Sequence, residues 1–140
     1  MREFSLPIRV YIEDTDAGGI VYYVNYLKYL ERARTEFMRE LGVHRAAVSD
    51  EGWGFVVSNL SVSYLMPAKL DDEIMATAIA QRVGGATIEF TQRIHRGDNV
   101  LLTADVQIAC VDQTTGRPRR LQGDIRERLL AAMTTEGNQV

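Results

Sequence analysis

One aspartate in this chain lies in a setting that suits covalent or acid–base chemistry. Asp16 belongs to the run EDTDAGG, where two glycines follow it and a segment with helical apolar spacing begins a few residues later. A carboxylate in such a loop can attack an electrophilic carbon or take a proton from water. Spacing alone favours a plainer interpretation, an aspartate that only shapes the turn, because aspartates are common in turns.

The backbone just after this loop could hold a developing negative charge. The first N–H groups of a helix have no intrahelical partner, and the helix dipole is positive there. A helix is predicted from Asn25, so these donors fall near Tyr23 to Asn25, and Tyr23 would act through its main chain. Gly18 and Gly19 would permit a positive φ and a close approach of backbone and ligand.

Other reactive residue types give weaker signals. Cys110 is the single cysteine, which excludes an internal disulfide, and its strand-like run VQIACVD predicts a small buried core residue. His44 and His95 have no partner at ligand spacing, so we expect no metal site.

Two acidic residues beside Asp16 and one charged pair further along have structural interpretations. Glu13 and Asp14 are predicted to be exposed or paired with an arginine, because neighbours in an extended turn point in different directions. Glu31 and Arg34 are interpreted as an ion pair on the helix surface.

The elements that must position this loop follow from periodicity. Residues 6–13 alternate as a strand, and TDAGG must end it. A four-turn helix is predicted from Asn25, which we interpret as its N-cap, to a stop at Gly42 in a left-handed conformation. The apolar face of this helix is Tyr26, Leu30, Ala33, Phe37 and Leu41.

Four further strands are predicted after the helix. A strand begins near Trp53 and closes at Pro67, after an optional helical turn at 44–49, and strands at 72–83, 86–96 and 99–112 follow with glycine turns between them. A short helix is predicted at 124–133. We therefore expect one α+β domain over residues 1–140, in which a five-stranded antiparallel sheet, connected as successive hairpins, wraps a long central helix. Such a sheet exposes an edge, which favours at least a homodimer.

Composition excludes several classes of protein. The 140 residues are 46% hydrophobic, enough for one core, and the net charge of −3 with interspersed signs offers no field for nucleic acid. No apolar run approaches the roughly 18 residues of a membrane span, and the first residues lack a secretory signal, so a soluble, cytoplasmic protein is expected.

Several runs resemble a known family. EDTDAGGIVYYVNYLKYLERARTE resembles the active-site signature of the 4-hydroxybenzoyl-CoA thioesterase group of the hotdog superfamily. NLSVSYLMPAKLDDEI is similar to the second strand and turn of that group, and FTQRIHRGDNVLLTADVQIACVD with GRPRRL is similar to its YbgC-type (Tol-Pal-associated) branch. The resemblance implies a hotdog fold, hydrolysis of acyl-CoA thioesters in the bacterial cytoplasm, no metal or other cofactor, and a dimer or a tetramer of paired dimers. It also matches Asp16 to the family's catalytic aspartate.

Two positions depart from the family pattern. Many YbgC-type members have histidine where this chain has Tyr23. At this position the chain instead resembles the 4-hydroxybenzoyl-CoA thioesterase, which also has tyrosine there. The basic cluster that holds the CoA phosphates in the 4-hydroxybenzoyl-CoA thioesterase has no counterpart here, because the matching region reads Gly84, Gly85 and Ala86.

The acyl pocket is expected between subunits. Val21 and Tyr26 at the helix start and Val57, Ser58 and Asn59 on the facing strand would line it together with Gly18, Gly19 and Asn25, although ordinary sheet packing explains the strand residues equally well. An alternative function is a non-catalytic hotdog protein that binds acyl-CoA or acyl carrier protein, or a structural partner of a membrane-linked complex. Hydration or dehydration of an acyl chain belongs to other branches of the hotdog superfamily, which use an aspartate–histidine pair on a different loop, and no such pair is found in this sequence.

Overall fold

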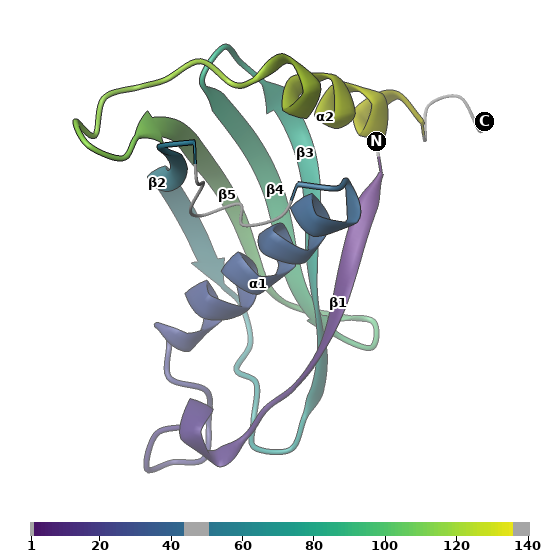
Figure 1. The fold of residues 1–140 in the computed structure, drawn as a ribbon. Coiled ribbons are helices and arrows are strands. Elements are labelled where there is room, and N and C mark those ends of the chain that lie inside the picture. The colour runs from purple at the N-terminus through teal and green to yellow at the C-terminus, as the bar shows by residue number, and fades with distance from the viewer. Residues whose placement is uncertain (1, 44–50, 136–140) are drawn as a thin grey trace.

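The computed structural model describes residues 2–43 and 51–135, in which five strands form one antiparallel sheet around a long helix (Figure 1). The sheet has the strand order β1-β3-β4-β5-β2. The elements are β1 (Glu3–Arg9), η1 (Ile12–Asp14), α1 (Asn25–Glu40), β2 (Trp53–Tyr64), β3 (Glu73–Val83), β4 (Thr87–Arg96), β5 (Asn99–Asp112) and α2 (Gly123–Thr135). The helical turn predicted at 44–49 lies outside the described residues.

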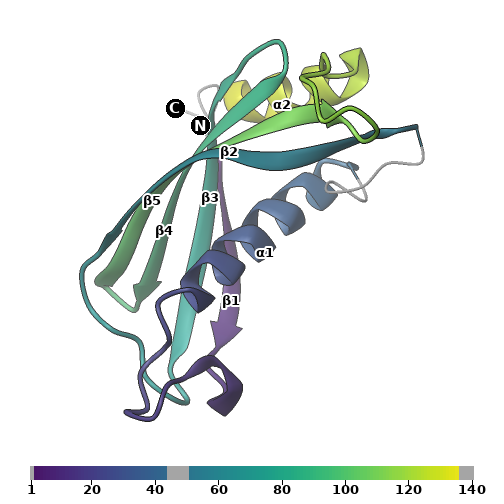
Figure 2. The same ribbon diagram turned by 90° about the vertical axis from the view of Figure 1, so that its left-hand side faces the viewer.

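The long helix α1 lies in the concave face of the sheet, as Figure 2 shows from the side, so the predicted hotdog architecture is confirmed. The predicted apolar face is buried from Tyr26 to Phe37, with Leu30 and Ala33 fully inaccessible, whereas Leu41 follows the helix and is half-buried. The ring of Phe37 packs edge to face on that of Phe90 in β4, with the ring centroids 5.8 Å apart. Burial of each large apolar side chain contributes about 1.5–3 kcal/mol, so this one face contributes much of the core's stability.

The two ends of α1 differ in how well the sequence predicted them. Gly42 has φ 85°, which confirms the left-handed stop, and Arg128 donates hydrogen bonds to the carbonyls of Leu41 and Gly42. The predicted N-cap was wrong, because Val24 is the cap residue and Asn25 is already helical. The Asn25 side-chain amide instead donates a hydrogen bond to the carboxylate of Asp14, on the other side of the preceding loop.

The connection between strands also corrects the prediction. β3, β4 and β5 are joined as successive hairpins, but β2 pairs with β5 and forms the far edge, so β2 and β3 are not neighbours. The chain between them crosses below the other strands (Figure 1). The first strand ends at Arg9 and not at residue 13, because residues 12–14 turn into η1.

A polar network is buried where α1 meets the sheet. Gln92 is fully buried; its amide nitrogen donates to the carbonyls of Leu30 and Thr77, and its Oε1 accepts from Arg34 at 2.9 Å. The spacing of Arg34 from Glu31 had predicted a pair on the helix surface, and this prediction was wrong for Arg34, which is buried. Burial lowers the pKa of its guanidinium from the usual value, and the charge of Glu31 opposes this shift.

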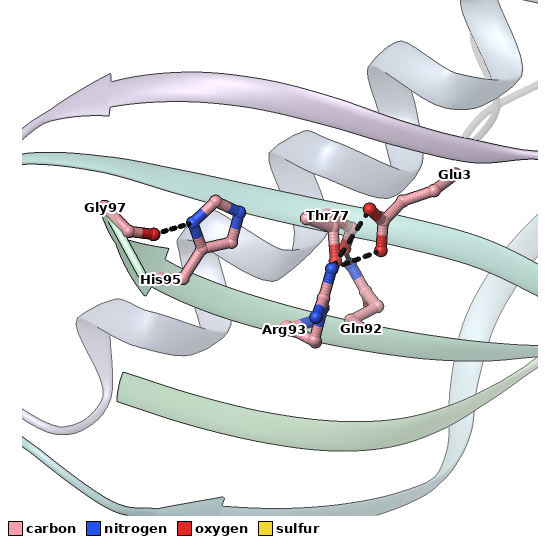
Figure 3. A network of polar contacts seen from close by, with 6 residues as sticks. All are labelled: Glu3, Thr77, Gln92, Arg93, His95 and Gly97. Atoms are coloured by element: carbon pink, nitrogen blue, oxygen red, sulfur yellow. Dashed lines mark hydrogen bonds and ion pairs between the residues drawn. The ribbon is translucent and has the colours of Figure 1, made fainter. Parts of the chain in front are cut away.

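The outer side of the same strands carries a second set of contacts. Arg93 on β4 reaches across β3 to the carboxylate of Glu3 on β1, at 3.0 and 3.1 Å, and Figure 3 shows both side chains together with Gln92 and Thr77. His95 at the end of β4 lies with its Nδ1 3.0 Å from the Gly97 carbonyl oxygen. Three strands are thus tied together on this face.

The two edges of the sheet differ in character. β1 contains Pro7 and is flanked by the ion pair of Arg9 with Glu73. β2 exposes apolar side chains along its length, among them Val56, Val57 and Leu60. The second helix, α2, packs against β3, and its residues Ile125, Leu129 and Ala132 are buried. Cys110 is buried as predicted. Neither described α-helix is long and apolar enough to cross a membrane.

Candidate functional site

The loop that carries Asp16 is a tight hairpin set between η1 and α1. Thr15 and Val21 form a bridge, the Asp16 N–H donates to the Ile20 carbonyl, and the Gly19 N–H donates back to the Asp16 carbonyl. Gly19 has φ 78°, a conformation that residues with a Cβ resist, so its glycine is required by the turn.

The hairpin is docked on the connection between β2 and β3. The Val21 N–H donates to the Ala68 carbonyl at 2.9 Å, and the Leu70 N–H donates to the Gly19 carbonyl at 3.0 Å. These two bonds join segments about fifty residues apart in sequence. The loop is therefore held by the sheet and is not a free turn.

Asp16 is exposed at the tip of this hairpin. Its Oδ1 accepts a hydrogen bond from the Gly18 N–H at 2.8 Å, and among the described residues no donor reaches its Oδ2. A Cβ at Gly18 would lie 3.3 Å from Oδ1, so a larger residue there would crowd the carboxylate. One carboxylate oxygen shapes the turn, and the other is available for chemistry.

The structure leaves fewer candidate oxyanion donors at the helix start than the sequence predicted. The Asn25 N–H donates to the Tyr22 carbonyl at 2.8 Å and is not available. Within the described parts of the chain, the N–H groups of Tyr23 and Val24 donate no hydrogen bond. Tyr23 itself is 60% exposed.

Asp14 is the residue that fixes the loop to the helix. It is buried, and its carboxylate accepts from the Tyr11 N–H at 2.9 Å and from the Asn25 side-chain amide at 2.8 Å. Its carbonyl accepts from the Tyr22 N–H. The predicted exposure or arginine pairing of Asp14 was wrong, because backbone and amide donors satisfy its charge. Burial, together with this nearby charge, raises the pKa of the Tyr29 hydroxyl above its usual value.

The residues predicted to line a pocket lie in several different places. Val21 and Tyr26 are buried, and the Tyr26 hydroxyl accepts from the Ala68 N–H at 2.9 Å, so both support the loop from beneath. Val57 lines a cavity beside α1, whereas Asn59 lines a polar hollow that also contains Glu89 and Asp105.

Ser58 lies between Val57 and Asn59 at an irregularity in the pairing of β2 with β5. Its hydroxyl donates to the carbonyl of Gln107 at 3.2 Å. The extra residue in β2 and the alternation of side chains along a strand explain why three consecutive residues serve different surroundings.

The cavity beside Val57 has a volume of about 330 Å³ and lies between α1 and β2. Its apolar lining is interrupted by two charged side chains from α1. The lining residues are Glu31, Arg34, Thr35, Met38, Phe55, Val56, Val57 and Ile108.

Tyr64 is a residue near the helix start that the sequence did not single out. It is the last residue of β2, and its hydroxyl donates to the carbonyl oxygen of Tyr23 at 3.1 Å. Only the pairing of a distant strand with the helix start brings them together, so no local pattern could have found it.

No group of three or more metal-binding side chains occurs among residues 2–43 and 51–135. His95 bonds a turn carbonyl, and His44 lies outside the described residues. Cys110 is buried, and this burial raises the pKa of its thiol above the usual value.

A hotdog domain with a carboxylate loop docked beside the start of its buried helix belongs to the class of thioesterase-like hotdog proteins. A comparison with family models agrees: the model of the Thioesterase-like superfamily matches residues 10–129, and the chain belongs to this family.

Relatives and solved structures support this assignment. The chain is 46% identical over 116 residues to the acyl-CoA thioesterase YbgC of Haemophilus influenzae, covering 82% of this chain and 85% of that one. It is 42% identical over 123 residues to the acyl-CoA thioester hydrolase YbgC of Escherichia coli O6:H1, with coverages of 87% and 92%. A probable thioesterase from Bartonella henselae has a TM-score of 0.80 at 35% identity, covering 86% of this chain and 100% of that one.

Proposed function

We propose that this protein hydrolyses acyl-CoA thioesters to a free acid and CoA, with Asp16 as the reacting carboxylate. The observation that carries the proposal is an exposed carboxylate, on a loop bonded to the β2–β3 connection, with one oxygen that no described residue occupies. Just before α1, the N–H groups of Tyr23 and Val24 likewise have no partner among the described residues. The relatives named as acyl-CoA thioesterases at 42% and 46% identity support the choice of substrate.

The reaction needs two functions from the protein. Asp16 either attacks the thioester carbonyl, forming a mixed anhydride that water then hydrolyses, or removes a proton from a water molecule that attacks the carbonyl. In both routes the carbon–sulfur bond breaks, CoA leaves as a thiolate and takes up a proton, and the net reaction consumes one water. The N–H groups of Tyr23 and Val24 are the donors for the carbonyl oxygen as it gains charge.

The cavity between α1 and β2 is the proposed place for the acyl group. It begins nearly two turns into the helix: Glu31, the first α1 residue that lines it, follows Asn25 by six positions, and at about 1.5 Å per residue this is roughly 9 Å along the axis. An acyl group attached at the helix start can therefore extend along α1 into this space.

The proposed assembly is a homodimer formed through β2. This strand is an edge of the sheet, and Val56, Val57 and Leu60 on it are 48%, 51% and 39% exposed. An unpaired strand with this much apolar surface pairs readily with a second copy. The cavity at Val57 would then be closed by the partner subunit, which agrees with an acyl pocket between subunits.

A second candidate function is binding of acyl-CoA or acyl carrier protein without hydrolysis. It is favoured by the hydrogen bond from the Gly18 N–H to Asp16, because an aspartate whose role is to shape a turn would make this bond. Hydrolysis requires the negative charge of Asp16, whereas a binding protein needs only an oxygen atom there to shape the turn.

The discriminating experiment is steady-state hydrolysis of butyryl-, palmitoyl- and benzoyl-CoA by the wild type and by Asp16→Asn. Asparagine keeps an oxygen for the Gly18 N–H and therefore keeps the turn, but it removes the carboxylate. Hydrolysis should fall by about 100-fold or more, since loss of a reacting group costs about 3 kcal/mol or more of transition-state stabilisation.

The matched control is Glu13→Gln, which removes a charge from the exposed neighbour in η1 and should leave hydrolysis unchanged. Wild-type turnover in Asp16→Asn would overturn the role of Asp16 in hydrolysis. No turnover of any of the three substrates by the wild type would support the binding protein instead. Calorimetric titration with the same CoA esters would then measure that binding directly.

A further inference from the structure

The helix start is held by a tyrosine that belongs to the sheet. The Tyr64 hydroxyl donates to the carbonyl oxygen of Tyr23 at 3.1 Å. In a regular α-helix that carbonyl would accept from the Leu27 N–H, but Leu27 donates to Val24 instead, at 3.0 Å. The Tyr23 carbonyl is thereby left for the phenol of Tyr64.

This hydrogen bond acts on a whole peptide group and not on one atom. The carbonyl of Tyr23 and the N–H of Val24 belong to the same planar trans peptide, so they point in opposite directions. Fixing the oxygen therefore fixes the direction of the Val24 N–H, which has no hydrogen-bond partner within the described residues. A donor at the oxygen also polarises the peptide and strengthens the N–H as a donor.

Tyr64 is itself held from two sides. It pairs with Leu102 in the last position of β2, and the next two N–H groups of the chain both donate to the Leu101 carbonyl. Its ring packs edge to face on Tyr26 at 5.6 Å and on Tyr23 at 6.4 Å. The Tyr64 phenol is thus held between the sheet and the peptide group of Tyr23 and Val24, just before α1.

We propose that Tyr64 is a positioning residue for thioester hydrolysis, which orients and polarises the Val24 N–H so that it stabilises the charged oxygen in the transition state. The inference rests on the proposed function, because it assigns a role in that reaction. It identifies Val24 as the donor whose geometry the sheet controls, and it makes the end of β2 part of the active site.

The phenol keeps its proton throughout the pH range in which the enzyme would be assayed. Partial burial, with the neighbouring Tyr23 and Tyr26, raises the pKa of Tyr64 above its ordinary value. The hydrogen bond to Tyr23 is therefore made by a neutral donor, and its contribution to kcat should not vary between pH 6 and 9.

The test compares Tyr64→Phe with Tyr22→Phe. Phenylalanine at 64 keeps the ring that packs on Tyr26 and removes only the hydroxyl. Tyr22 is an exposed tyrosine whose ring lies 5.0 Å from that of Tyr23, so its variant removes a phenol from the same cluster. We expect Tyr64→Phe to lower kcat about tenfold, as expected for loss of one orienting hydrogen bond, with KM unchanged. Tyr22→Phe should behave as the wild type.

A second measurement is independent of turnover. In an Asp16→Asn background, isotope-edited infrared spectra of the bound thioester carbonyl of benzoyl-CoA report the strength of the oxyanion donors. Adding Tyr64→Phe should move the carbonyl stretch toward its frequency in free benzoyl-CoA. A merely structural tyrosine would change the melting temperature and leave this frequency in place.

The outcomes separate the two proposals. An inactive Asp16→Asn beside a Tyr64→Phe variant with wild-type kcat and an unshifted carbonyl stretch would overturn the positioning role alone. An equal loss of kcat in Tyr22→Phe would also overturn it. Full activity in Asp16→Asn, or none in the wild type, would overturn the proposed function.

Discussion

Replacement of Gln92 by leucine should destabilise the protein strongly, because it removes the centre of the buried polar network. Gln92 is fully buried and makes three hydrogen bonds, one of them from the guanidinium of Arg34. A bond to a charged group contributes about 1.5–3 kcal/mol and each neutral bond about 0.5–1.5 kcal/mol. Leucine recovers part of this sum through its apolar surface, so we expect a net loss of about 3 kcal/mol.

The assay is urea denaturation at fixed protein concentration, followed by circular dichroism, with thermal melting as a check. At about 4 °C per kcal/mol for a chain of this size, the melting temperature should fall by roughly 12 °C. The double variant Arg34→Met with Gln92→Leu is the internal control. Replacing a whole buried polar pair by apolar residues is often nearly neutral, whereas removing one partner leaves a buried charge unpaired.

The double variant should therefore be more stable than the sum of the two single losses predicts, by 1 kcal/mol or more. Two results would refute the reasoning. A loss below about 1 kcal/mol in Gln92→Leu would mean that water replaces the lost contacts, and strictly additive losses would mean that Arg34 and Gln92 are not coupled.

Three further predictions concern single side chains. Tyr23→Phe should retain most of the hydrolytic activity, because the proposed role of Tyr23 lies in its backbone N–H and not in its phenol; a folded but inactive variant would contradict this. Partial burial opposes the charge of Asp72, but the Lys69 N–H and Arg96 together hold its pKa below the ordinary value. Its folded-state pKa is depressed, so its contribution to stability should be present above about pH 4 and lost as pH falls through the folded-state pKa. Urea titrations should show that Asp72→Asn flattens this acid dependence. Cys110 should react with a thiol reagent only after unfolding, which absorbance with and without denaturant will measure.

The sequence predicted the elements well where one local signal decides them. The apolar spacing from Tyr26 to Phe37 requires one buried helix face, and Gly42 has the left-handed φ that ends it. The hairpins between β3, β4 and β5 follow from alternation and glycine turns. These features depend on neighbours along the chain, so periodicity is enough to find them.

The failures are contacts between distant segments. The place of β2 beside β5 depends on a crossing connection, and alternation alone cannot distinguish that order from a hairpin with β3. Asn25 was interpreted as a cap, but the buried carboxylate of Asp14 competes for its amide. Tyr64 could not be linked to the helix start before the edge of the sheet was known.

Pro7 gives the sheet a built-in limit to its growth. It lies in β1, the edge opposite β2, and proline has no N–H to offer an additional strand. Two copies joined through β2 would present β1 at both outer ends, so any further strand would have to add to an edge that contains this proline. Head-to-tail addition of subunits, which produces fibres when an open edge meets a different open edge, is disfavoured at this position of β1. One ring-closed residue at a distance from the chemistry thus makes this edge a poorer template for further copies of the chain.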